Sequence, residues 1–447
     1  MNGLDVGTLC RIQFALTIGF HFLFPPISIG LASLLVLVEW RAWRYQDPVA
    51  DSAGRFFGKL LGLTFAVGVA TGIPMEFQFG TNWARYSKFV GDIFGAPLAA
   101  EGVFAFFLES GFLGLYLFGR QRVSKKWHFL AIFMVAFGSI MSAFWILAAN
   151  SWMQTPAGFV IRNGRAELTS FADAIFNPST LPRFFHTLFA SFIAGSFFMA
   201  GVSAAVLLKE RGNQVARYTL KLAVICGLVV SVMVVFPFGD MHARQVALTQ
   251  PEKFAAIEGL YTSQTAAPLV MFAIPFNKPP ELKAKTEIPA VLSWLVFGRI
   301  DAKIQGIKDF PPDDIPPLWL TFVSFHNMVV LGLYFIFAMS YACLRLWHGR
   351  LFEGTKFLRL LVISIPLPLV ACELGWTAAE VGRQPWAIYH VLRTADAFSI
   401  TLSAREVLAS ILMFSAIYLM LLILYLYILV AKVRHGPDEA GGKEVAA

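Results

Sequence analysis

The chain has 447 residues, of which 57% are hydrophobic and only 14% are charged, and its mean hydropathy is +0.65. A typical soluble domain carries about 25% charged residues, so this composition excludes an ordinary soluble protein. The net charge of +8 does not indicate nucleic-acid binding, because the Lys and Arg residues gather in short clusters between apolar stretches and form no single basic face. We therefore expect an all-α integral membrane protein, a single bundle whose elements are sized by the bilayer.

Nine stretches are apolar and long enough for a spanning helix, which needs about 20 residues. In chain order they are Arg11–Val38, Leu60–Phe79, Phe94–Gly119, Trp127–Asn150, Phe184–Leu208, Leu220–Phe238, Leu318–Leu346, Leu360–Val381 and Val407–Val433. The pattern predicts spans one to six in residues 1–238, an external loop in 239–317, spans seven to nine in 318–433 and a disordered tail in 434–447.

The charges between the spans predict an orientation. The connections after the first, third, fifth and seventh spans carry four Lys or Arg residues each, whereas the other short connections carry two or three. Because short loops rich in Lys and Arg stay on the cytoplasmic side, this alternation places the N-terminus outside and the C-terminus in the cytoplasm. An odd number of spans agrees with that orientation.

Several titratable residues fall inside the predicted spans, where a charge costs at least a few kcal/mol and is a site hypothesis by default. Seven are candidates for a site: His21, Glu101, Glu109, His186, His326, Glu373 and Glu380. Taken singly, an intramembrane His is explained as simply by a hydrogen bond to a neighbouring helix. Glu101 and Glu109 are eight residues apart, about 80° and roughly 12 Å along one helix, and could pass protons between them.

Two interpretations of these residues stay open at this point. A His on one helix and a Met on another, such as Met328, form the axial pair of a six-coordinate haem, and a single His or carboxylate leaves iron with an open position. A haem-free proton or ion transporter would use the same carboxylates and predicts no cofactor. Spacing alone does not decide between them, since a single Met is more often a packing residue.

The long loop and the end of the eighth span add polar candidates. A quinol site needs a proton acceptor and a donor to the ring oxygens, roles that Lys253 and Glu258 could fill near the outer surface. A solvated amphipathic helix explains the same two residues without any ligand. Arg383 lies three residues after Glu380 and suits an anionic carboxylate such as a haem propionate.

Five long motifs carry a resemblance to a known family. They are RIQFALTIGFHFLFPP from Arg11, GAPLAAEGVFAFFLES from Gly95, ILAANSWMQTP from Ile146, QPEKFAAIEG from Gln250 and ELGWTAAEVGRQPW from Glu373. Together, over nearly the whole chain, they resemble subunit I of cytochrome bd-type terminal quinol oxidases. The resemblance implies a respiratory enzyme that oxidises membrane quinol and reduces O2 to water, and so generates a membrane potential without pumping protons.

The resemblance also implies cofactors and residue roles. It implies two haems b and one haem d, with His186 and Met328 as ligands of the low-spin haem b, and His21 and Glu380 as a pair serving the other two haems. Glu101 and Glu109 match carboxylates beside the di-haem site and on its proton route, and Trp376 matches an aromatic residue between haems. Lys253 and Glu258 match quinol-loop residues, which favours the quinol interpretation over the solvated helix. Arg11 and Arg383 match candidates for propionate contacts.

Some features depart from parts of the family. His326 stands where some relatives have Arg near the low-spin haem, and the loop is of the short type. The segment YHVLRTADAFS from Tyr389 resembles the cyanide-insensitive branch, in which the third haem can be b instead of d. The family implies a second multi-span subunit, in some members a very small third subunit, and a location in the bacterial cytoplasmic membrane with the quinol loop outside.

Overall fold

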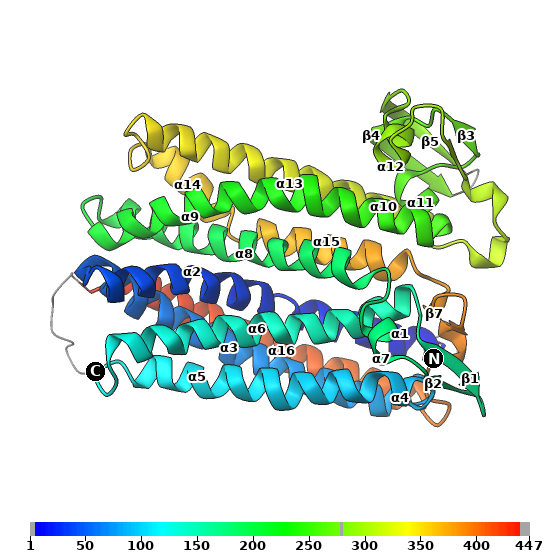
Figure 1. Ribbon diagram of the computed structural model, residues 1–447, viewed down its shortest axis with the longest axis horizontal. Helices are drawn as coiled ribbons and strands as arrows, with labels where there is room; N and C mark the ends of the chain where they lie inside the picture. The colour runs from blue at the N-terminus through cyan, green and yellow to red at the C-terminus, as the bar shows by residue number, and fades with distance from the viewer. Residues whose placement is uncertain (1–4, 278–279, 439–447) are drawn as a thin grey trace.

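The computed structural model describes residues 5–277 and 280–438, which form an elongated bundle of helices with a small β-containing loop at one end (Figure 1). Within these ranges, nine helices are long and apolar enough to cross a membrane, which confirms the all-α class and the predicted number of spans. They run over Val6–Arg44, Pro48–Thr81, Ala84–Phe118, Lys125–Gln154, Thr180–Lys209, Gln214–Thr249, Leu318–Trp347, Thr355–Val381 and Ala404–His435.

Four of the nine spanning segments are interrupted. The first is divided into α1 (Val6–His21) and α2 (Pro25–Arg44), because Pro25 and Pro26 provide no N–H to continue the ladder. Short π-helices separate α4 (Ala84–Ala100) from α5 (Phe107–Phe118) and α9 (Gln214–Met233) from α10 (Asp240–Thr249). A turn divides the eighth into α14 (Thr355–Ile363) and α15 (Leu367–Val381).

The uninterrupted spanning helices are α3 (Pro48–Thr81), α6 (Lys125–Gln154), α8 (Thr180–Lys209), α13 (Leu318–Trp347) and α16 (Ala404–His435). Their starts follow ordinary capping chemistry. Asp47 accepts hydrogen bonds from the first amides of α3, and Ser403 forms a capping box with Glu406 at the start of α16. Of the predicted tail, residues 434–435 belong to α16, and 439–447 lie outside the described residues.

Helix α8 lies near the middle of the bundle and packs closely against α2. A Cβ at Gly30 would lie 2.2 Å from the Ser191 backbone oxygen, and a Cβ at Gly195 would lie 2.3 Å from the Gly30 carbonyl carbon. Only glycine allows this backbone approach. The crossing holds α8 in place, and α8 carries His186.

The remaining elements lie at the end of the bundle where the N-terminus is drawn (Figure 1). The connection after α10 contains α11 (Pro251–Glu258), α12 (Val291–Phe297) and an antiparallel hairpin of β4 (Leu269–Asn277) and β5 (Pro280–Ile288). Short pairs join β1 (Phe159–Arg162) to β2 (Arg165–Leu168), β3 (Gln264–Thr265) to β6 (Lys303–Ile304), and β7 (Trp386–Ile388) to β8 (Leu392–Arg393). One more short helix, α7 (Phe171–Ile175), follows β2. The predicted loop is thus largely ordered, and its first residues, up to Thr249, continue the sixth spanning segment.

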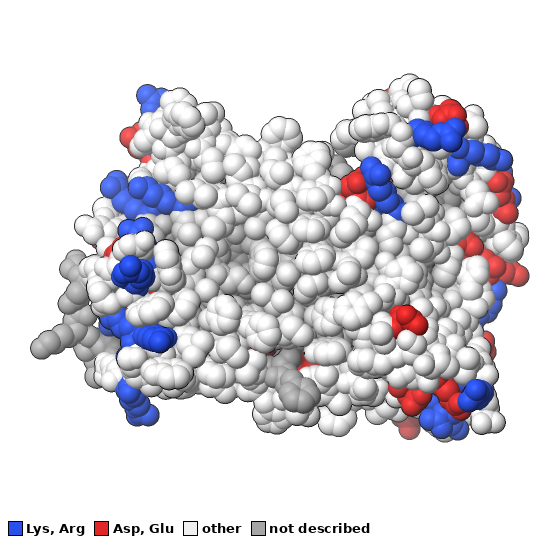
Figure 2. Space-filling view, in the orientation of Figure 1, with Lys and Arg blue, Asp and Glu red and all other residues white. Residues whose placement is uncertain are grey.

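Charged side chains gather at the two ends of the molecule (Figure 2). On the face shown, the end near the C-terminus carries mostly Lys and Arg, the end with the hairpin carries both signs, and the band between them is almost free of charge. This band is what a bilayer requires.

Candidate functional site

A cavity of about 1390 Å³ extends through the half of the bundle nearer the hairpin. Its walls contain eleven of the thirteen residues singled out in the sequence: His21, Glu101, Glu109, His186, Lys253, Glu258, His326, Met328, Trp376, Glu380 and Arg383. The other two do not line the cavity: Arg11 is exposed on α1, and Glu373 lies on α15. The fold therefore brings these residues, from five spanning segments and the loop, to one space.

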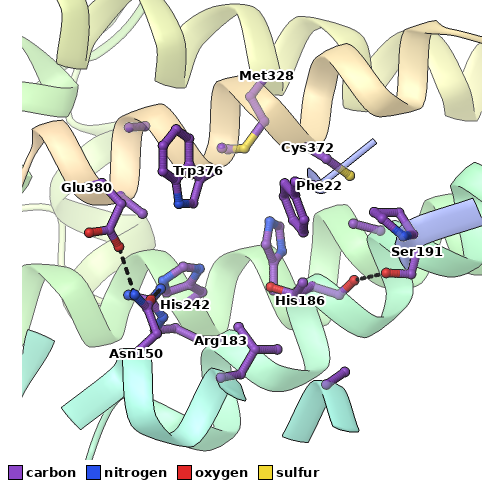
Figure 3. A pocket seen from close by; sticks show the side chains of 18 of the residues that line it. Phe22, Asn150, Arg183, His186, Ser191, His242, Met328, Cys372, Trp376 and Glu380 are labelled. Carbon is purple, nitrogen blue, oxygen red and sulfur yellow. Dashed lines mark hydrogen bonds between the residues drawn. The ribbon is translucent and has the colours of Figure 1, made fainter. Parts of the chain in front are cut away.

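His186 of α8 and Met328 of α13 both line the cavity, and their side chains point toward one another in Figure 3. The Nδ1 atom of His186 is buried and has no hydrogen-bond partner among the described residues. The Met328 sulfur rests on α15, where a Cβ at Gly375 would lie 2.8 Å from it. A His nitrogen and a thioether that face a shared space are the donor set of a low-spin haem.

His21 ends α1, directly before the proline break. Its Nδ1 lies 3.1 Å from the Thr71 hydroxyl of α3, and the residue lines the cavity. Its ring also lies against α3, since a Cβ at Gly72 would be 3.2 Å from its Cε1. A ring nitrogen fixed by such a partner is typical of a metal-ligating His.

Glu380 on α15 lies in a dense polar cluster. Arg383 donates a hydrogen bond to Glu380 Oε2, and Asn150 and Gln154 of α6 approach Oε1 at 3.1 and 3.4 Å. Arg183 of α8 donates to the Asn150 side-chain oxygen. Figure 3 shows Trp376 on the same helix as Glu380, between that carboxylate and Met328.

This cluster has unused hydrogen-bonding capacity. The Nε and Nη1 atoms of both Arg183 and Arg383 are buried without partners among the described residues. Buried guanidinium groups require anionic partners, and the planar donors of Arg match carboxylates. Unpaired Arg donors beside Glu380, and an unpaired His nitrogen opposite a Met, fit a haem with its two propionates.

Lys253 and Glu258 belong to the same short helix, α11, but have different surroundings. Lys253 Nζ donates to Gln154 at 3.0 Å and to Gln250 at 3.3 Å, whereas Glu258 Oε2 is buried without a partner. Burial and the nearby Arg183 hold the pKa of Lys253 well below its usual range. Burial raises the pKa of Glu258 to about 8. Both side chains line the cavity.

The two carboxylates of the third spanning segment each have a serine partner on α6. Ser142 donates to Glu101 at 2.7 Å, and Ser139 donates to Glu109. Glu101 begins the π-helix, a local geometry that is frequent at functional sites. Glu373, the other intramembrane carboxylate, faces Gly19 of α1 and does not line the cavity.

His326 is held by backbone groups. Its Nε2 lies 3.1 Å from the carbonyl of Val270 in β4, and its Nδ1 lies 3.1 Å from that of Phe322 in its own helix. Its ring stacks on Phe322 with 3.8 Å between centroids. Among the described residues it therefore ties the hairpin to α13 while it borders the cavity.

Sequence reasoning missed several residues of this site, among them Glu76, Asn150, Gln154, Arg183 and His242. The His242 ring, on α10, is 5.4 Å from that of His186 and was expected to lie in the external loop. Arg183 falls in the predicted connection between the fourth and fifth spans, where it served only in the count of Lys and Arg residues. Its position three residues before His186 was a signal, because i and i+3 share a helix face.

Comparisons with known proteins agree with this site. Residues 9–437 match the family described as "Cytochrome bd terminal oxidase subunit I". The chain is 40% identical over 450 residues to cytochrome bd ubiquinol oxidase subunit 1 of Bacillus subtilis, covering 98% of this chain and 95% of that protein. It is 36% identical over 502 residues to cytochrome bd-II ubiquinol oxidase subunit 1 of Escherichia coli, covering 97% of each.

A solved structure, the bd oxidase from Geobacillus thermodenitrificans, superposes with a TM-score of 0.90 at 33% identity and covers 98% of this chain and 100% of that one. Both sequence and fold therefore agree over almost the full length, and they do not favour a haem-free transporter. The chain belongs to the cytochrome bd terminal oxidase subunit I family.

Proposed function

We propose that this protein is the haem-bearing catalytic subunit of a respiratory terminal oxidase that oxidises membrane quinol and reduces O2 to water. The observation that carries the proposal is the single cavity in which His21, His186, Met328 and Glu380 converge with unpaired Arg donors. Family membership over 98% of the chain supports the same activity, because the relative from Bacillus subtilis is named a ubiquinol oxidase subunit.

The cofactors we propose are two haems b and one haem d, with b replacing d if the chain belongs to the cyanide-insensitive branch. Haem held at these ligands supplies one-electron transfer and, at an iron with an open position, binding of O2. His186 and Met328 would hold the low-spin haem. His21 and Glu380 would hold the other two as a pair, and Trp376 would lie between haems.

Quinol oxidation is assigned to the part of the cavity under the ordered loop. A quinol releases two protons as it gives up two electrons, so its site needs a base. Glu258 is buried in the cavity wall with an unpaired oxygen and can accept one of these protons. His326 borders the same cavity through α13.

Oxygen reduction consumes protons, and Glu101 and Glu109 are placed to deliver them. They lie on one spanning segment with a serine partner each, and both reach the cavity. If the Lys- and Arg-rich end faces the cytoplasm, oxygen reduction takes up protons from the cytoplasm. Quinol oxidation at the loop end then releases protons on the opposite side of the membrane. Such a reaction generates a membrane potential without pumping.

A second multi-span subunit is the proposed partner, with a very small third subunit in some family members, in a bacterial cytoplasmic membrane. Large apolar side chains are exposed along α16, among them Leu412, Leu419, Met420 and Ile423. Lipid or a partner helix can cover such a face equally well, so this surface is compatible with the partner without identifying it.

The test is a reduced-minus-oxidised absorption spectrum of the purified complex, with and without carbon monoxide. We expect haem bands with a component that binds carbon monoxide, and selective loss of the low-spin b signal in His186→Ala and Met328→Ala. A chlorin band would identify haem d, and its absence would indicate three haems b. A colourless protein would contradict the proposal and lead instead to proton-transport assays on Glu101 and Glu109.

A further inference from the structure

A short hairpin between α15 and α16 contacts both ends of the long loop. It consists of β7 and β8 and begins three residues after Arg383, so it continues from the helix that carries Glu380. Its Ile388 is fully buried in an apolar cluster that contains residues of α6. The Tyr389 amide donates to the Met153 carbonyl of α6 at 3.0 Å. The hairpin is therefore fixed to the bundle, and a loop can be fastened to it.

The turn of the hairpin holds the start of the loop through one carboxylate. Glu252, in the first turn of α11, is only 8% exposed. The Tyr389 hydroxyl donates a hydrogen bond to Glu252 Oε2, and His390 Nε2 lies 3.3 Å from Oε1. Burial and the Glu252 carboxylate raise the pKa of Tyr389 above its usual range, so the phenol stays protonated and can donate. Because a buried carboxylate is costly without partners, these contacts fix α11 to the hairpin.

The backbone of this turn has a conformation that side chains rarely adopt. His390 has a φ of 55° and is the third residue of the turn that the Val391 amide closes, 2.9 Å from the Ile388 carbonyl. Glycine or asparagine is usual where a turn needs a positive φ, because a Cβ disfavours it. The His390 ring centroid is 4.2 Å from that of Tyr389, and both side chains reach Glu252. The turn thus accepts backbone strain and gains two partners for the carboxylate.

The same hairpin also holds the end of the loop. Arg393 of β8 donates to Asp314 Oδ1 at 2.7 Å and to the Asp313 carbonyl at 3.0 Å. Its guanidinium lies 4.4 Å from the centre of the Trp386 ring of β7. Asp314 precedes the start of α13 by four residues. One hairpin therefore fixes both α11 and the segment that leads into α13.

We propose that the β7–β8 hairpin is a clasp that holds α11 in place for quinol, with Tyr389 as the positioning residue. The inference rests on the proposed function, since it takes Glu258, in the last turn of α11, to be the quinol base. Glu252 and Glu258 lie on one helix of eight residues, so a shift of its first turn also moves the base. Tyr389 does not line the cavity and acts through Glu252.

The experiment measures Tyr389→Phe in the assembled, haem-loaded complex with a short-chain ubiquinol. The variant leaves the Glu252 carboxylate without its hydroxyl partner, so quinol must order α11 as it binds. We expect the KM for the ubiquinol to rise about tenfold, as the loss of a hydrogen bond to a charged group allows, with kcat unchanged at saturation. Hydrogen-exchange mass spectrometry should show faster amide exchange in α11.

The matched control is Tyr261→Phe, which removes a hydroxyl bond to the Phe276 carbonyl in the same loop. It should change neither the KM nor the exchange of α11. Glu252→Leu added to Tyr389→Phe should bring the KM back toward the wild-type value, because it removes the unpaired buried carboxylate. An unchanged KM in Tyr389→Phe, a lower kcat at unchanged KM, or a double variant no better than Tyr389→Phe would overturn the proposal.

If Tyr389→Phe does not assemble, Arg393→Gln opens the clasp at the other end of the loop and should also speed exchange in α11. Unchanged exchange in that variant would be equally contrary. A wild-type complex that does not oxidise quinol would contradict the proposed function itself. The exchange comparison needs no quinol, so it would still decide whether the hairpin holds α11.

Discussion

Glu258 combines an unpaired carboxylate oxygen with complete burial, and burial raises its pKa to about 8. Below that pH the carboxyl group is mostly protonated and cannot accept a proton from quinol. We therefore expect the rate of quinol oxidation to rise as the pH increases through about 8. Glu258→Gln should remove that rise and leave a lower rate that varies little with pH. Initial rates across the range from about pH 6 to about pH 9 measure this dependence.

The control for Glu258 is Glu252 on the same helix. Glu252 accepts a hydrogen bond from Tyr389 and lies 3.3 Å from His390, so its oxygens have partners outside the quinol region. Glu252→Gln should keep the rise in rate with pH. If the wild-type rate instead falls as the pH increases through about 8, Glu258 is not the base.

Gly375 offers a test of the Met328 position that leaves the ligand itself intact. A Cβ at Gly375 would lie 2.8 Å from the Met328 sulfur, closer than such atoms pack, so the thioether must move. Because Met is flexible, the cost in stability should be small, about 1 kcal/mol, at the low end of overpacking effects. Gly375→Ala should nevertheless weaken or shift the low-spin haem band. Gly111→Ala, where nothing lies within 4 Å of the added atom, should not.

At the residue scale, the titratable residues inside the spans were the part of the site that the sequence could predict. His21, His186, Glu101, Glu109 and Glu380 stand out in any apolar stretch, because a titratable group there is costly. Polar residues near span ends carry no such signal, and Asn150, Gln154 and Arg183 acquire their roles only when α6, α8 and α15 pack together. Trp376 is an ordinary apolar residue by composition, so only the family resemblance singled it out. Met328 was one possible haem ligand, and the resemblance favoured that role over simple packing.

At the scale of elements, His326 fastens the loop to the bundle through the Val270 carbonyl of β4. His326→Phe keeps a ring on Phe322 and removes this bond, which costs about 1 kcal/mol and should accelerate amide exchange of β4 and β5 about fivefold. Hydrogen-exchange mass spectrometry measures this change in the exchange rate. Asn327→Ala is the matched control, since the Asn327 side chain bonds within its own helix. A changed haem spectrum with unchanged exchange would instead place His326 at the cofactor.

Hydropathy predicts where the spanning segments lie, but not where they are interrupted. All nine spans could be predicted, since each holds a run of apolar residues of bilayer length. Their interruptions were not predicted, although Pro25, Pro237 and Pro366 lie at three of the four and proline removes a backbone donor. The π-turn Glu101–Phe106 contains no proline. His242 was assigned to the loop because α10 contains too many polar residues to be recognised as part of a span. In the structure, α10 nevertheless continues the sixth segment as far as Thr249.

At the scale of the whole molecule, a charge asymmetry stabilises one orientation in the membrane. On the face shown in Figure 2, the end near the C-terminus carries mostly Lys and Arg. Lys and Arg are retained on the cytoplasmic side during insertion. We therefore expect the α8–α9 connection to be cytoplasmic and the β1–β2 turn to be external.

Single cysteines at Gly212 and Asn163 report on these two connections. Both positions lie in turns, and a Cβ at Gly212 would meet nothing within 4 Å. In a background with the four native cysteines replaced by serine, a membrane-impermeant maleimide should label Asn163→Cys in intact spheroplasts and Gly212→Cys only after lysis. The cysteine-free background gives the blank. Labelling of Gly212→Cys without lysis would reverse the orientation, and the haem ligands, Glu258 and the loop would then face the cytoplasm, so that quinol oxidation would release its protons inside the cell.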